Sequence, residues 1–316
     1  MALSTIQNNS FADTAVHGYR NLVINGGMIV SQRGDFTSAS SASINNYYVD
    51  RWLAVVVTVT ANKQHVLNTT YGNSFLLTAT STGSGRLGIT QRLETQTYML
   101  NTTVTLSCWV KSNNANARLY IYNDVDGTST SSPHTGDGTW QKLTMSLALT
   151  SGWTNFEVSS RIMSSANGNV SITSGDYIET AQVQLELGSQ ATPFEHRPYA
   201  DELARCQRYF FRRGNTNNLS NGYDSIGAGV GISTSVCRII VSYPCEMRTK
   251  PTCSFNGNIS LSPASGIVSA INANYCGDSG GLLDITESAS SISTGTGIAM
   301  YAQNIAGDYF DFDAEL

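Results

Sequence analysis

The sequence predicts an all-β protein in which two β-domains are joined by one α-helix. Only 13% of the residues are charged, against about 25% in ordinary soluble domains, and Ser, Thr, Asn and Gly replace them. The helix formers Lys, Glu and Ala are sparse outside one segment. Short strand candidates recur with turn signals between them. A length of 316 residues allows two domains with separate cores.

The clearest strand candidate is 104–111, where apolar and polar side chains alternate. Leu106 and Cys108 fall on one face and Trp109 on the other. In 118–122 both tyrosines lie opposite the aliphatic side chains. The strands expected in the first domain are 55–60, 74–80, 104–111, 118–122, 139–145, 156–158 and 177–187.

One helix is expected, over about 199–211. Pro198 stands where a first-turn proline is tolerated, and Asp201 and Glu202 lie near the positive end of the helix dipole. Apolar residues then form a single stripe, which indicates a packing and linking role. Strands return after the helix, with 236–243, 298–302 and 308–313 as the candidates. We expect the last of these to be an edge strand with a solvated acidic face.

Several short runs resemble a signature of bacteriophage tail-fibre and related virion proteins. They are QLELG at 184–188, ATPFE at 191–195 and ELARCQRYF at 202–210, with NLVING at 21–26, QRG at 32–34, DRW at 50–52 and the final AEL at 314–316. A second resemblance concerns strands 106–111, 138–143 and 181–186, which are similar to carbohydrate-binding modules of the galactose-binding jelly-roll kind. It implies that the first domain is a jelly-roll β-sandwich. From the strands that return after the helix we expect a second, C-terminal β-sandwich.

The expected organisation has four parts: an N-terminal attachment arm at 1–20, a jelly roll at 21–197, the linking helix at 198–213 and a distal β-rich domain at 214–316. The resemblance implies a non-enzymatic homotrimeric virion fibre, assembled in the host bacterial cytoplasm. Residues 1–20 would hold another virion protein, and the β-domains would bind bacterial surface glycan. Two alternatives stay open: a purely structural tail or capsid component, and a glycan depolymerase.

Aromatic side chains are the expected sugar-binding groups, because the apolar face of a pyranose stacks on a flat ring. In the resembled fold the strands that carry Trp109, Tyr120 and Tyr122 are neighbours, so these residues would share a surface. Packing inside the sandwich or against another subunit is the alternative. The full set of carbohydrate-binding candidates is Trp109, Tyr120, Tyr122, Tyr223, Tyr275 and Tyr301.

Composition argues against several other partners and cofactors. A net charge of −5 gives no reason to expect nucleic acid or an anionic membrane surface. No apolar run approaches 18 residues, so no membrane insertion is expected, and residues 1–18 lack the pattern of a signal peptide. The six cysteines form no Cys-x-x-Cys pair and the four histidines do not cluster with them. We therefore expect free thiols and no metal site or cofactor.

Two motifs suggest chemistry and are better explained as turns. The GDSGG run at 277–281 matches the surroundings of the nucleophile in trypsin-like proteases. None of the four histidines has the sequence context that such a triad needs, so no catalytic residue is expected. The DVDG run at 124–127 resembles part of a calcium loop. It lacks the first ligand and the closing glutamate of an EF-hand.

Overall fold

The computed structural model describes residues 20–94, 96–214, 223–303 and 307–316. The all-β class with a single α-helix in this part of the chain is confirmed. Contacts divide the chain into two compact units, one of residues 20–29 with 36–197 and the other of residues 30–35 with 198–316. The short segment 30–35, which the expected first domain included, therefore belongs to the second unit. The expected attachment arm lies outside the described residues, apart from Arg20.

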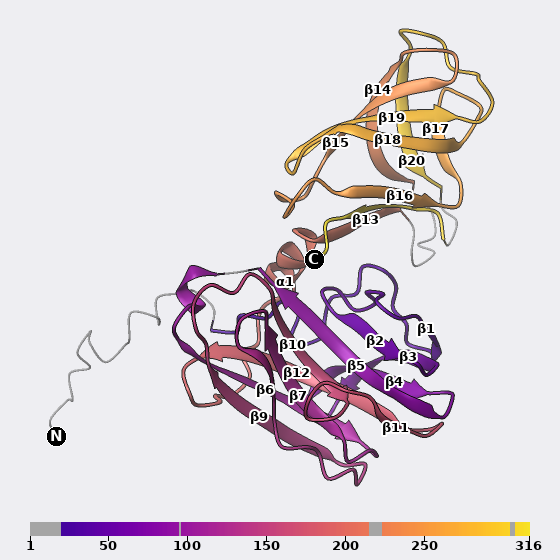
Figure 1. The fold of residues 1–316 in the computed structure, drawn as a ribbon. Helices are drawn as coiled ribbons and strands as arrows, with labels where there is room; N and C mark the ends of the chain where they lie inside the picture. The colour runs from indigo at the N-terminus through magenta and orange to yellow at the C-terminus, as the bar shows by residue number, and fades with distance from the viewer. Residues whose placement is uncertain (1–19, 95, 215–222, 304–306) are drawn as a thin grey trace, which may run out of the picture. The chain divides into compact units, whose positions relative to one another are not determined.

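The first unit is a sandwich of two antiparallel sheets (Figure 1). Sheet A has the strand order β1-β3-β4-β12-β6-β9, and its strands are β1 (Ser40–Ala42), β3 (Ala61–Thr69), β4 (Gly72–Ala79), β12 (Tyr177–Leu187), β6 (Thr103–Ser112) and β9 (Trp140–Ala148). Sheet B has the order β11-β5-β10-β7-β8 with β2 also on β5, and its strands are β11 (Val170–Ile172), β5 (Gly83–Leu93), β10 (Phe156–Ile162), β7 (Ala117–Asn123), β8 (Gly127–Thr130) and β2 (Leu53–Val57). A short 3-10 helix, Thr97–Met99, lies between β5 and β6.

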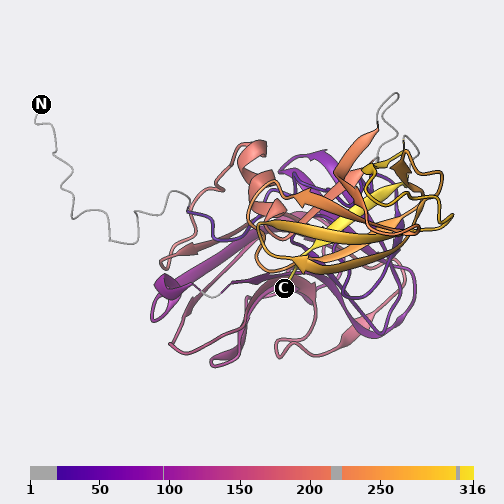
Figure 2. The same cartoon turned by 90° about the horizontal axis from the view of Figure 1, so that it is seen from above.

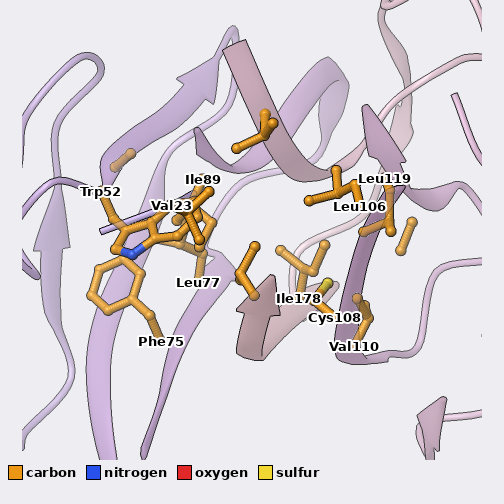
Figure 3. Close-up of a cluster of buried hydrophobic side chains, with 14 of the residues drawn as sticks. Val23, Trp52, Phe75, Leu77, Ile89, Leu106, Cys108, Val110, Leu119 and Ile178 are labelled. Carbon is orange, nitrogen blue, oxygen red and sulfur yellow. The ribbon is translucent and has the colours of Figure 1, made fainter. Parts of the chain in front are cut away.

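The core of this unit lies between the two sheets, because every second residue of each strand points inward. Figure 3 shows Leu106 and Cys108 of sheet A on the same side as Leu119 of sheet B. A polar contact crosses the same interior, where the Thr180 hydroxyl donates to Ser160 Oγ over 3.0 Å. The residues that the alternation of 104–111 places on its apolar face are therefore those of β6 that point into the core.

Segment 21–29 carries the NLVING run and is bound by buried polar side chains. Asn21 donates from Nδ2 to the carbonyl of Val183 at 3.0 Å and accepts the N–H of Leu185 at 3.1 Å, both on β12. Trp52 of the DRW run donates its indole N–H to the carbonyl of Asn25 at 2.9 Å. The Arg197 guanidinium donates to the carbonyl of Val23 at 3.1 Å and also to that of Asn21. These bonds satisfy buried backbone groups that no strand partner would reach.

The second unit is a smaller sandwich. Its three-stranded sheet has the order β13-β21-β16, with β13 (Phe210–Gly214), β21 (Tyr309–Asp313) and β16 (Thr252–Asn256). We name its six-stranded sheet sheet D. The strand order in sheet D is β17-β20-β14-β15-β19-β18. These strands are β17 (Ile259–Ser262), β20 (Gly297–Ala302), β14 (Asp224–Gly231), β15 (Val236–Ser242), β19 (Gly280–Glu287) and β18 (Val268–Cys276). Helix α1 (Tyr199–Gln207), drawn as a salmon-coloured coil in Figure 2, leads into β13.

The helix ends earlier than expected, at Gln207 rather than near 211, because Phe210 and Phe211 pair with β21 and are buried there. The expectation of a C-terminal edge strand is wrong for the same reason. Strand β21 lies in the middle of its sheet, where Phe310 and Phe312 are buried and Asp311 accepts two 2.6 Å bonds from Arg212.

The QRG run and the C-terminal AEL run meet within the second unit. Gln32 donates from Nε2 to the carbonyl of Phe210 at 2.8 Å, and the Arg33 guanidinium lies 3.5 Å from the centre of the Phe210 ring. Arg33 also lies 3.3 Å from an oxygen of Asp313 and 3.4 Å from one of Glu315. Cation–π contact and paired carboxylates together hold the half-buried guanidinium.

We expect Trp52→Ala to lower the free energy of unfolding of the first unit by about 3–5 kcal/mol, since the side chain is fully buried and its N–H is bonded. Trp109→Ala, on the outward face of β6, should cost only about 0.5–1.5 kcal/mol from the loss of a ring pair. Urea titration followed by tryptophan fluorescence measures both. Equal losses for the two variants would contradict the assignment of Trp52 to the core.

Candidate functional site

The structure separates the three aromatic candidates of the first unit. Trp109 lies on β6 in sheet A, whereas Tyr120 and Tyr122 lie on β7 in sheet B. The expectation that their strands are neighbours in one sheet is therefore wrong. The chain crosses from one sheet to the other between β6 and β7, so the outward faces of these strands point to opposite sides of the sandwich.

Trp109 belongs to a group of three rings on the outward face of sheet A. The ring of Tyr71 stacks on it with centroids 3.9 Å apart and 16° between planes. Trp140 meets Tyr71 edge-on at 5.4 Å. All three side chains are half-buried. We name Tyr71, Trp109 and Trp140 the aromatic cluster.

The backbone explains why these rings gather. Lys111, two residues after Trp109 on β6, is the cross-strand partner of Trp140 on β9, so both tryptophans face outward on adjacent strands. On the other side, Trp109 pairs with Ala181 of β12. Tyr71, from the β3–β4 turn, stacks on the Trp109 ring. Trp140 was detectable from the alternation of its strand once β6 and β9 are known to pair, but no local signal marks Tyr71.

Polar groups border the aromatic cluster. The Ser74 hydroxyl donates to Glu179 Oε1 over 2.6 Å, and the Lys111 ammonium lies 3.8 Å from Glu179 Oε2. The same ammonium lies 6.0 Å from the ring centre of Tyr177. Ser74 and Glu179 are buried, so the partly exposed Lys111 ammonium is the group of this edge that a sugar hydroxyl can reach beside the half-buried rings.

Tyr120 and Tyr122 stack on each other, with centroids 6.3 Å apart and planes within 5°. Tyr120 is only 3% exposed. Arg161 covers its ring at 4.6 Å, and Asn167 donates from Nδ2 to its hydroxyl at 3.2 Å. Burial raises the pKa of Tyr120 above its usual value. The Tyr120 ring is therefore part of the packing of sheet B, whereas Tyr122 is half-buried.

The candidates of the second unit do not form one group. Tyr223 is 74% exposed and meets Tyr301 of β20 edge-on at 5.1 Å. Tyr275, 57% exposed, lies on β18 under the Arg238 guanidinium at 4.7 Å. Strands β14, β15 and β19 separate β20 from β18. Tyr275 therefore lies on the edge strand at one end of sheet D, and Tyr301 lies on the second strand from the other end.

The protease-like motif lies in a turn between β18 and β19. Gly277 donates its N–H to the carbonyl of Gly280 at 2.9 Å, and the Ser279 hydroxyl donates to the neighbouring Asp278 carboxylate at 2.9 Å. The sequence of the second unit contains no histidine. In the first unit, His65 is buried with Nε2 2.7 Å from the carbonyl of Met28. These contacts supply no base for the serine.

The calcium-like motif is also a turn, because its carboxylates already accept protein hydrogen bonds. Asp124 accepts the N–H and the hydroxyl of Thr154 at 2.8 and 2.6 Å and the N–H of Asn155 at 3.1 Å. Asp126 accepts the hydroxyl of Thr150 at 2.6 Å. The hydroxyl of Thr154 lowers the pKa of Asp124 furthest, followed by the backbone N–H of Asn155 and then that of Thr154. The two aspartates tie the β7–β8 turn to the segment before β10.

Three structural facts concern metals, thiols and membranes. Within the described residues, no three His, Cys, Asp or Glu side chains gather closely enough to hold a metal ion. The six cysteines, all of them in the described part of the chain, form no disulfide bond. Burial raises the pKa of Cys108 and of Cys253 to about 12. The one α-helix of that same part of the chain is too short to cross a membrane.

No protein-family model matches the sequence, and no curated protein matches it. Among solved structures, the chain is similar to the enzymatically active domain of tailspike protein 4 of bacteriophage CBA120, with 18% identity over 53% of this chain and 21% of that one and a TM-score of 0.31. The CBM22-1 xylan-binding domain of Paenibacillus barcinonensis Xyn10C gives 17% identity, 50% and 99% coverage and a TM-score of 0.30. The chain is also similar to TmCBM61 in complex with β-1,4-galactotriose, with 13% identity over 54% of this chain and 100% of that one and a TM-score of 0.28. At these scores the fold assignment rests on the strand pairing described above.

We expect Asp124→Asn to lower the melting temperature of the first unit by a few degrees at pH 7. The folded-state pKa lies below the unfolded value of about 3.9, so the carboxylate stabilises the fold above that value and loses this effect as pH falls through the folded pKa. The difference between variant and wild type should therefore shrink below about pH 4. Differential scanning calorimetry from pH 7 to pH 2.5 measures it. Asp278→Asn, an exposed turn aspartate of the second unit, is the control, and a difference that stayed constant with pH would refute the ionic role of Asp124.

Proposed function

We propose that this chain is a non-enzymatic fibre protein of a bacteriophage particle and that it binds bacterial surface glycan through the aromatic cluster of sheet A. The observation that carries the proposal is the joint placement of Tyr71, Trp109 and Trp140 beside the Lys111–Glu179 pair. Flat rings bordered by a few convergent polar groups are the chemistry that recognises a pyranose.

Binding at this surface requires no covalent step. A sugar ring can stack on the accessible part of the aromatic cluster while its hydroxyls meet the Lys111 ammonium, which lies 3.8 Å from the buried Glu179 carboxylate. The carboxylate of Glu179 already accepts a hydrogen bond from Ser74 and lies near the Lys111 ammonium, which favours a binding role over that of a general acid. One such site binds weakly, because few groups contribute. Linking several copies raises avidity by roughly 10²–10⁴.

The virion role rests on the resemblance of the short runs to tail-fibre proteins. Their residues hold segments together in this structure, as Asn21, Trp52 and Arg33 do, and this is consistent with a shared architecture. We further propose that residues 1–20 attach the chain to another virion protein. Electron microscopy of particles labelled on the second unit would distinguish a host-binding fibre from a purely structural component. Release of reducing sugar from host polysaccharide would instead indicate a depolymerase.

We expect Trp109→Ala and Trp140→Ala each to weaken binding of host surface polysaccharide by at least about tenfold, since one stacked ring contributes on the order of 1.4 kcal/mol or more. Affinity electrophoresis in gels that contain the polysaccharide measures the effect. Tyr275→Ala, which removes a more exposed ring of the second unit, is the control. If both tryptophan variants were folded and bound as the wild type does while Tyr275→Ala failed, the receptor site would belong to the second unit.

We also expect the protein to be a homotrimer, as the fibre resemblance implies. Its unfolding midpoint should then rise with protein concentration, because assembly contributes to stability. Multi-angle light scattering from about 1 to 100 μM, a range that spans typical subunit affinities, measures the mass. A single species of 33.9 kDa across the series would rule the trimer out.

A further inference from the structure

Positively charged side chains gather on the outward face of sheet B, on the opposite side of the sandwich from the aromatic cluster. Four arginines occupy outward positions of three adjacent strands, where the inward positions are the core residues Leu87, Leu119 and Val158. We name these arginines the arginine face: Arg86 and Arg92 on β5, Arg118 on β7 and Arg161 on β10.

The pairing within this face is electrostatically unfavourable. Arg161 is directly opposite Arg118 on one side and Gly88 on the other, and like charges in such positions destabilise a sheet. The outward positions of the three strands hold one carboxylate, Glu157, which lies 3.0 Å from Arg92 and 3.6 Å from Arg161. These positions hold no further carboxylate for Arg86 and Arg118. Four positive and one negative side chain leave an excess of three positive charges, in a chain whose net charge is −5. Departures from local rules of this kind are expected at functional sites.

Two of the four arginines, Arg161 and Arg86, are held in place by hydrogen bonds. Arg161 is 4% exposed and donates from Nη1 to Asn167 Oδ1 at 3.0 Å. Arg86 donates to the same oxygen at 3.1 Å, yet its own Nε is buried with no hydrogen-bond partner among the described residues. Burial lowers the pKa of Arg161. Tyr120 and Glu157 oppose this shift, and the charges of Arg86 and Arg92 add to it with smaller effects. An added anion would relieve this repulsion and supply missing acceptors.

The Asn167 amide indicates which anion fits. Its planar oxygen lies between two guanidinium groups, as a carboxylate oxygen would. Tyr122, half-buried and opposite Glu157, provides a ring on the same face, and Glu157 in turn is opposite Arg92. The negative net charge of the whole chain disfavours a long nucleic acid. We propose that the arginine face is a second glycan site, which binds the carboxylate of an acidic, uronate-containing polysaccharide. It deepens the proposed glycan-binding function but involves none of the residues of the aromatic cluster.

The test uses the full-length protein and isothermal titration calorimetry with a galacturonic-acid trisaccharide and a neutral galactose trisaccharide. The wild type should bind the acidic sugar more tightly, and added salt should weaken that binding. Arg118→Gln and Arg86→Gln should each weaken it by at least about tenfold, as expected for loss of a charge-assisted hydrogen bond. Arg118→Lys, which keeps the charge without the planar fork, should recover only part of it. Circular dichroism verifies that each variant is folded.

Two controls separate this inference from the proposed function. Arg213→Gln removes the same charge from a half-buried arginine of the second unit and should leave the acidic sugar bound as in the wild type. Trp109→Ala should lose the neutral sugar and keep the acidic one. Equal binding of both sugars by the wild type, or unchanged binding of the acidic sugar by Arg118→Gln and Arg86→Gln, would overturn the proposal. Single-stranded DNA that bound as tightly as the acidic sugar would also overturn it, since the face would then be a general polyanion surface.

Discussion

The two-residue period of the β-strand is the constraint on which the rest of the first unit depends. Each strand places alternate side chains in the core, so the remaining side chains must form two outward faces on opposite sides of the sandwich. In β6 this puts Cys108 inside and Trp109 outside; in β7 it puts Leu119 inside and Arg118 outside. The aromatic cluster and the arginine face are both consequences of where the core residues lie. A one-residue register slip would exchange core and surface along a whole strand.

Buried hydrogen bonds attach the irregular segments to the sheets. Segment 21–29 makes two backbone hydrogen bonds to β12, at Leu22 and Gly26, and the side chains of Asn21, Asn25 and Trp52 add further buried bonds. Arg33 attaches the C-terminal end of the second unit by ion pairs with the carboxylates of Asp313 and Glu315. The short runs that resemble virion fibre proteins thus have structural roles. Residues in such roles carry the architecture, whereas recognition depends on the outward positions of the strands.

The sequence predicted the strands in which apolar and polar side chains alternate. It did not predict the features that depend on which strands pair with each other. Strands β6 and β12 follow the expected ranges because their apolar period is clear. Strands β5 and β14 were missed. Each contains three glycines, and these hide the two-residue alternation of apolar and polar side chains. Helix α1 is shorter than expected because tertiary pairing of Phe210 outweighs the local pattern. Of the aromatic cluster, Trp109 was identified in advance, while Trp140 required knowledge of the β6–β9 pairing and Tyr71 that of the β3–β4 turn. No local signal in a sequence specifies which sheet a strand joins.

The two proposed surfaces differ in physical character, and this has a consequence for binding to a real polysaccharide. Stacking on Trp109 depends on apolar contact and changes little with ionic strength. Contact with Arg118 and Arg86 depends on charge and is screened over about 8–10 Å at physiological salt. A polymer with both neutral and acidic sugars would therefore bind with a salt-sensitive and a salt-insensitive component, one from each side of the same sandwich. The salt dependence of the whole interaction, measured on the wild type and on one variant from each face, assigns the two components to their surfaces without knowledge of the host glycan.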